Sequence, residues 1–117
     1  MIEYNLDKIV NENSDIVELI EKLEISEEEE VSKLKAKLML YDGSVLWIRE
    51  VRRREILDLY SYYWLRPDGT IIVGWDNAPH HKYLNGYPHH RHIGNKTETS
   101  QERDLKGVLK FIRKYLA

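Results

Sequence analysis

The sequence predicts an α+β fold: an antiparallel meander sheet of four or five strands, a C-terminal helix packed on one face, and a long histidine-rich loop between the last strand and that helix. Apolar and polar residues alternate through the middle of the chain, which is typical of half-buried strands. Two short turn sequences, at residues 42–43 and 67–69, separate these segments, and connections this short join antiparallel neighbours. Helical spacing of apolar residues is clear near the C-terminus.

The first thirty residues are less regular than the middle of the chain. A short helix is expected around Tyr4 to Val10. From Ile16 to Ile25 the apolar residues fit either one face of a helix or a strand, and we favour the strand. Residues 26–30 are polar and are expected to form a turn.

The clearest strand covers residues 31–41, where leucines alternate with lysines that share one solvent-facing, basic side. Asp42 and Gly43 then have the residue types of a two-residue hairpin loop. Such a loop sets apolar residues opposite one another on one face and opposite charges on the other, which favours this register. The expected cross-strand pairs are Leu38–Trp47, Leu40–Val45 and Lys35–Glu50.

A second hairpin is expected further along the chain. Residues 52–55 should form a turn and residues 56–65 a third strand. The Pro-Asp-Gly sequence at 67–69 predicts a three-residue loop, in which proline sets φ and glycine takes the left-handed position. This loop places Tyr63 opposite Val73 and Ser61 opposite Trp75. The residues expected together on the other face are Tyr60, Tyr62, Trp64 and Asp76.

The segment from residue 77 to 96 shows no alternation and contains all five histidines. We therefore expect a loop of about twenty residues, a length that is usually functional or disordered. Thr99 and Glu102 then fit a capping box at the start of a helix. The spacing of the following apolar residues predicts a helix from about Ser100 to Tyr115, lying across one face of the sheet.

Composition predicts one cytoplasmic domain over residues 1–117. Hydrophobic residues make up 42% and charged residues 32%, and the chain shows neither a long apolar run nor a signal peptide. The absence of cysteine excludes a thiolate nucleophile and cysteine-based metal sites. Residues 1–30 hold eleven of the 20 acids and two of the 18 Lys and Arg residues. Residues 31–117 are therefore basic and could face a polyanion, or simply form a solvated, thermophile-like surface.

The five histidines lie within thirteen residues, which is too close for chance, and three interpretations are open. They bind a divalent metal together with Asp76. Alternatively, one or two act as general base and acid in RNA cleavage, for which we choose His80 and His89, while Arg91 stabilises the phosphorane charge. In the third interpretation they cap carbonyls or stack on aromatic rings. The candidate catalytic residues are His80, His81, His89, His90, His92 and Asp76.

Two prolines precede histidine pairs and predict how the chain folds back. Pro79 and Pro88 each restrict the backbone at the entry to a pair, and Gly86 lies between them. We expect an imidazole of the first pair within about 6 Å of the second group. Asp76 or Asn77 should hydrogen-bond into that cluster.

A non-catalytic binding module is the alternative to an enzyme. A row of aromatic residues on one strand resembles a base-stacking platform for nucleic acid, although such a row is also typical of a sheet face covered by a helix or by a second copy of the chain. The module would bind a nucleic acid or a partner protein, and a homodimer is expected as a further possibility. The candidate binding residues are Tyr60, Tyr62, Trp64, Lys33, Lys35, Lys37, Arg49 and Arg91.

Four segments together resemble the TumE family of toxins from bacterial and archaeal toxin–antitoxin systems. They are Tyr-Ser-Tyr-Tyr-Trp at 60–64, Pro-Asp-Gly at 67–69, Trp-Asp-Asn-Ala-Pro-His-His at 75–81 and Tyr-Pro-His-His-Arg-His at 87–92. The resemblance implies a toxin paired with a small helix-turn-helix antitoxin encoded next to it. Toxins of this size often cut RNA, so an endoribonuclease is expected by class. The family motif positions are Trp75, Asp76, Asn77, Pro79, His80, His81, Pro88, His89, His90 and His92.

Overall fold

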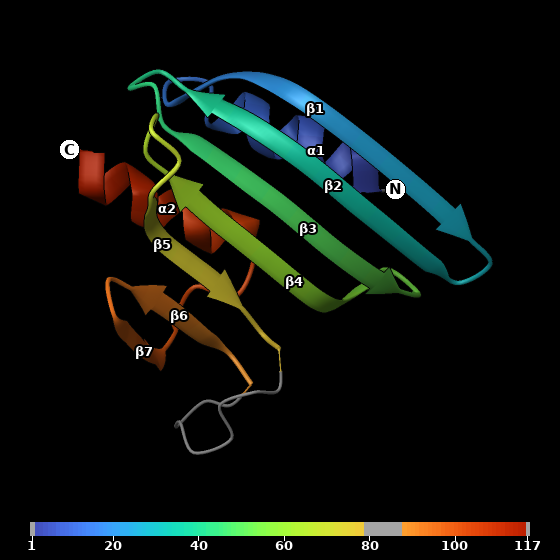
Figure 1. Cartoon of the computed structure of the whole chain (residues 1–117). Coiled ribbons are helices and arrows are strands. Elements are labelled where there is room, and N and C mark those ends of the chain that lie inside the picture. The colour runs from blue at the N-terminus through green and yellow to red at the C-terminus, as the bar shows by residue number, and fades with distance from the viewer. Residues whose placement is uncertain (1, 79–87, 117) are drawn as a thin grey trace.

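The computed structural model describes residues 2–78 and 88–116 (Figure 1). Seven strands in these residues form one antiparallel sheet whose spatial order follows the chain order. The predicted α+β meander is confirmed, but the predicted count of four or five strands is wrong. The elements are α1 (Ile2–Glu12), β1 (Val17–Glu28), β2 (Val31–Leu40), β3 (Val45–Arg53), β4 (Ile56–Leu65), β5 (Ile71–Asp76), β6 (His90–Ile93), β7 (Lys96–Thr99) and α2 (Leu105–Leu116).

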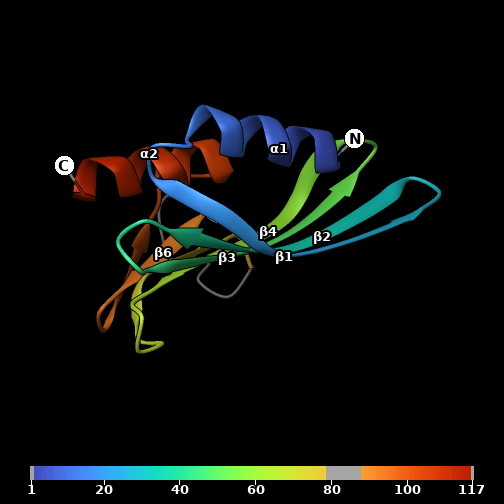
Figure 2. The same ribbon diagram turned by 90° about the horizontal axis from the view of Figure 1, so that it is seen from above.

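Both helices lie on the same face of the sheet, as the view in Figure 2 shows. Most of the alternate residues of the strands that point toward the helices are apolar and buried, which explains the strong alternation of the sequence. Burial of this face supplies most of the hydrophobic stabilisation. We call the opposite side of the sheet the open face. Buried residues of the core include Leu34, Leu38, Leu46, Ile48, Tyr62, Trp64, Trp75, Leu109 and Ile112.

The hairpin between β2 and β3 differs from the prediction by one residue. Leu38 pairs with Leu46, whereas Trp47 pairs with Lys37. The loop has three residues because Gly43, at φ +88°, closes a tight turn and the Leu40 amide donates to the Ser44 carbonyl at 3.0 Å. A shift of one residue moves a side chain to the other face. Trp47 therefore lies on the open face, and the predicted register is wrong.

The hairpin between β4 and β5 contains an irregularity that the turn sequence does not reveal. Leu65 pairs with Ile71 as predicted, but the register shifts beside it, so that Ser61 pairs with Asp76. Such bulges invert the faces of the residues that follow. Asp76 consequently lies on the open face, opposite to Tyr60 and Tyr62. The prediction that these three side chains share a face is wrong.

The N-terminal segment is a helix followed by a strand, as we favoured. Strand β1 continues to Glu28, so the expected turn at 26–30 shrinks to its last two residues, of which Glu29 has a positive φ of 51°. The turn expected at 52–55 is likewise reduced to Arg54 and Glu55, both with positive φ. Two successive left-handed residues form the tight loop that matches the twist of a hairpin.

The expected loop of twenty residues is wrong, because β6 and β7 form a further hairpin within it. Helix α2 begins at Leu105 rather than near Ser100, and Thr99 belongs to β7. The predicted capping box is therefore wrong as well. Asp104 caps the helix instead, since its Oδ1 accepts from the Gly107 amide at 2.8 Å.

Candidate active site

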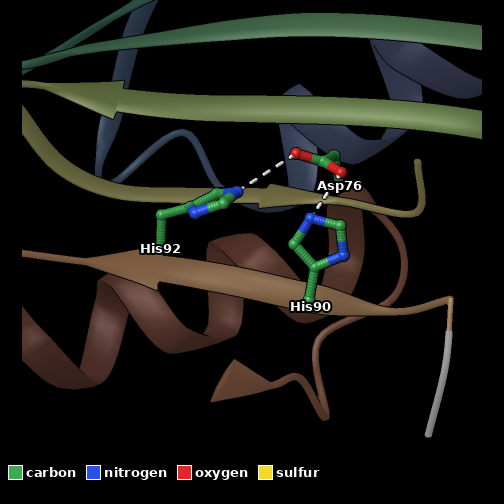
Figure 3. A group of neighbouring side chains, drawn as sticks. All are labelled: Asp76, His90 and His92. Carbon is green, nitrogen blue, oxygen red and sulfur yellow. Dashed lines mark ion pairs between the residues drawn. The ribbon is translucent and has the colours of Figure 1, made fainter. Parts of the chain in front are cut away.

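Three side chains that can take part in proton transfer or metal binding meet where β5 pairs with β6. Asp76 lies opposite His90, and Gly74 lies opposite His92. Since alternate residues of a strand share a face, both imidazoles stand beside the Asp76 carboxylate on the open face (Figure 3). The His90 Nε2 atom is 2.8 Å from Asp76 Oδ1, and the His92 Nε2 atom is 3.5 Å from Oδ2. We call Asp76, His90 and His92 the Asp76 cluster.

Hydrogen bonds orient each member of the Asp76 cluster. The Nδ1 atom of His90 is 3.0 Å from the Pro88 carbonyl oxygen, and that of His92 is 3.1 Å from Thr97 Oγ1. Because a carbonyl oxygen only accepts, Nδ1 of His90 carries the proton and donates it. The ring therefore directs Nε2 toward the carboxylate.

The carboxylate of Asp76 is held by two neighbouring donors. Its Oδ1 accepts from the Ala78 amide at 3.0 Å, and its Oδ2 accepts from the Tyr63 hydroxyl at 3.4 Å. Burial, followed by the charge of Asp76 and this hydrogen bond, raises the pKa of Tyr63. The phenol thus keeps its proton at neutral pH and remains a donor.

Exposure increases from the inside of the cluster to the solvent. The His90 side chain is 2% exposed, Asp76 13% and His92 32%. A buried ionisable group needs a partner, and His90 has one in Asp76. His92 is the member that solvent or a bound molecule reaches most easily.

Two residues that the sequence reasoning missed shape the floor of the site. The Tyr63 ring lies so close to the Gly74 backbone that a Cβ at position 74 would be 2.4 Å from Tyr63 Cε1. Only glycine permits that approach.

Asn77 fixes the end of β5, because its Oδ1 accepts from the Tyr60 amide at 2.9 Å and its Nδ2 donates to the Asp58 carbonyl at 2.9 Å. Asn77 thereby anchors the chain next to Asp76.

His89 does not join the Asp76 cluster. Its ring stacks on Tyr60, with centroids 5.8 Å apart, and its Nδ1 is 2.8 Å from the Tyr60 hydroxyl. Burial, with smaller effects of Arg103 and His90, lowers the pKa of His89. The predicted contact of Asp76 with the histidines is present through His90. His80 and His81, with the predicted approach of the two histidine groups, lie outside the described residues.

Arg91 points toward the helix side of the sheet, away from the Asp76 cluster. Its Nε donates to Glu98 at 2.8 Å and its Nη1 to Glu102 at 2.7 Å, and the guanidinium lies over the Phe111 ring. Two carboxylates therefore already neutralise this cation. The geometry does not support the expected role of Arg91 at a phosphorane.

The aromatic row expected to stack on bases is buried. Tyr60, Tyr62 and Trp64 belong to the core under the helices. The Tyr62 hydroxyl donates to Glu50 Oε2 at 2.5 Å, inside the protein. The interpretation as a sheet face covered by a helix therefore fits this row, and no open stacking platform is formed by it. An exposed aromatic residue of the open face is Trp47, which sequence reasoning had placed inward.

The expected basic residues lie on the open face together with Trp47. The ammonium groups of Lys22 and Lys37 are 5.7 and 5.3 Å from the centroid of the Trp47 ring. Strand pairing places Lys35, Arg49, Ser61, Asp76 and His90 in one row across five neighbouring strands. The basic residues and the Asp76 cluster are therefore parts of one surface. The basic residues predicted for it are Lys33, Lys35, Lys37 and Arg49.

Comparison with protein-family models gives a match over residues 6–116 to the model described as Toxin TumE. Comparison with curated proteins and with solved structures finds no match. Among the described residues, no helix has the length and apolar character needed to cross a membrane.

Proposed function

We propose that this chain, which belongs to the TumE toxin family, acts by cleaving RNA at the Asp76 cluster. Membership of a toxin family implies an antitoxin partner, and we propose that this partner is a small helix-turn-helix protein. The observation that carries the proposed activity is the convergence of two imidazoles on one largely buried carboxylate, on the same face as the basic residues.

The chemistry of RNA cleavage matches the properties of these groups. A base must take the proton of the attacking oxygen, and an acid must protonate the leaving oxygen. Imidazole exchanges protons near neutral pH, and His92 is the ring that a substrate can reach. His92 would take the proton of the attacking oxygen and, once protonated, deliver that proton to the leaving oxygen. The buried contact between His90 and Asp76 would hold the carboxylate in position beside it.

The basic residues of the open face support a polyanionic substrate. Lys35 and Arg49 lie in the same row across the sheet as Asp76, on the neighbouring strands β2 and β3. Contacts of cations with phosphates supply much of the affinity for nucleic acids and make binding depend on salt. Trp47 offers a ring on which a base of a single strand could stack.

A non-catalytic binding module remains the second candidate. The observation that favours it is the same basic surface, which includes Trp47. Such a surface could bind a nucleic acid without any cluster of titratable side chains. The two candidates differ in turnover. A bell-shaped pH profile of an activity supports the enzyme, whereas salt-dependent binding without turnover supports the module.

The test is incubation of the purified chain with total RNA and with transfer RNA, each with and without a chelator. We expect cleavage that falls at least about 100-fold in His92→Ala and Asp76→Asn. Asp7→Asn, an exposed change in α1, is the matched control and should cleave like the unmodified chain. Absence of cleavage in every condition, or equal cleavage by His92→Ala, refutes the proposed activity.

A further inference from the structure

We infer that the Asp76 cluster is a binding site for one divalent ion of a first-row transition metal, of which zinc is the type. The inference rests on the proposed function only in using the same three side chains, because metal binding can be measured without RNA. Two imidazoles and one carboxylate form a donor set that these ions favour, while magnesium and calcium prefer oxygen donors.

The distances between the donor atoms fit one small ion. Metal bonds of about 2.0–2.1 Å in a tetrahedral site place donor atoms roughly 3.3 Å apart. The His90 and His92 nitrogens lie 2.8 and 3.5 Å from the Oδ1 and Oδ2 atoms of Asp76, respectively. One donor atom from each of the three residues lies within 4.8 Å of the others, which is close enough for them to share one ion.

The hydrogen bonds behind the imidazoles are those that a metal site requires. A histidine that binds a metal through Nε2 usually donates its Nδ1 proton to a carboxylate, a backbone carbonyl or water, which fixes the tautomer. His90 has the Pro88 carbonyl in that position, and the Thr97 hydroxyl can accept from Nδ1 of His92 in the same way. The pairing of β6 with β7 holds the second contact in place.

The contact between His90 Nε2 and Asp76 Oδ1 places either a proton or a metal ion between the two atoms. Because Nδ1 of His90 donates to Pro88, a neutral ring presents the lone pair of Nε2 to the carboxylate oxygen 2.8 Å away. Two lone pairs at this distance repel one another unless a proton or a metal ion lies between them. The low exposure of this pair strengthens the requirement, since water screens the charge of Asp76 poorly there.

Three protein ligands leave room for water or substrate. Structural zinc sites are closed by four protein ligands, whereas catalytic sites keep one position open. The exposed side of His92 faces the solvent, so the open position is accessible. With a metal ion on Nε2, His92 would no longer exchange protons, and water activated by the metal at neutral pH would supply the base for cleavage instead.

The test uses the full chain freed of metal by a chelator and then dialysed. Zinc alone is titrated in by calorimetry, native mass spectrometry counts the ions, and cobalt absorption reports the donor set. We expect one ion per chain. His92→Ala and Asp76→Asn should weaken binding at least about tenfold. The matched variants His89→Ala and Asp7→Asn should bind like the unmodified chain, because neither side chain belongs to the cluster.

Each result decides between the two proposals. Failure of the folded chain to bind zinc or cobalt, or undiminished binding by both His92→Ala and Asp76→Asn, overturns the metal site. Loss of binding in a His80→Ala, His81→Ala double variant alone also overturns it. RNA cleavage that persists without metal leaves the proposed function intact and removes the metal. One bound ion without cleavage of any RNA leaves the metal site intact and refutes the proposed activity.

Discussion

Replacing Gly74 by alanine tests how the floor of the site is built. The added Cβ would lie 2.4 Å from Cε1 and 2.6 Å from Cδ1 of the Tyr63 ring. Carbon atoms in contact are about 3.5–4.0 Å apart, so the ring must move by about 1 Å or more. That displacement also breaks the hydrogen bond from the Tyr63 hydroxyl to Asp76.

The size of the effect follows from overpacking. Inserting one methyl group into a filled space costs about 1–3 kcal/mol in the free energy of unfolding. For a chain of this length, each kcal/mol lowers Tm by about 4 °C, so we expect Gly74→Ala to lower it by about 4–12 °C. Urea unfolding followed by circular dichroism measures the same change at constant temperature.

A double-mutant cycle with Tyr63→Ala gives the decisive comparison. Without the ring, the three atoms nearest to a Cβ at position 74 are gone, so the second substitution should cost less than about 0.5 kcal/mol. The coupling energy between Gly74 and Tyr63 is then about 0.5–3 kcal/mol. Equal costs of Gly74→Ala in both backgrounds would refute the contact between this ring and the strand.

Three further perturbations test other parts of the structure. The hydrogen bond from Arg113 lowers the pKa of Asp15, so this carboxylate stabilises the fold at pH values above its ordinary pKa and stops doing so as the pH falls through its lowered pKa. Asp15→Asn should therefore flatten the acid side of a plot of unfolding free energy against pH. An unchanged plot contradicts the interaction between Arg113 and Asp15. Leu38→Ala should destabilise by about 2–5 kcal/mol in urea unfolding, because this side chain is fully buried, and a cost below 1 kcal/mol would contradict its place in the core. Lys35→Ala and Arg49→Ala should each reduce the slope of log binding constant against log salt for single-stranded RNA by about 0.7, and an unchanged slope excludes phosphate contacts at the open face.

The strands β2 to β5 could be predicted because their alternation is strong and their turn residues are distinctive. The registers could not be predicted, because the Asp-Gly sequence fits both a two-residue and a three-residue loop. The backbone hydrogen bond from the Leu40 amide to the Ser44 carbonyl shows which loop is formed. The bulge beside Leu65 leaves no mark in the sequence either. An error of one residue in each hairpin sufficed to misplace Trp47 and Asp76.

The candidate site was predictable in composition but not in grouping. Strands β6 and β7 carry polar residues on both faces, so they lack the alternation by which a strand is recognised. Once β6 is known to be a strand, its period of two separates His90 and His92 from Arg91 without further information. The role of Tyr63 and Gly74 depends on a contact across two strands, which residue types alone do not disclose.

The order of the strands leaves the acidic strand β1 at one rim of the sheet and the short β7 at the other. An edge strand with unpaired backbone groups can pair with a strand of another chain, which leads to aggregation. Glutamates along β1 repel the same rim of a second molecule, and β7, with four residues, offers too short a template. The acidity of the first thirty residues thus works against edge-to-edge association of a chain whose other residues carry an excess of lysine and arginine.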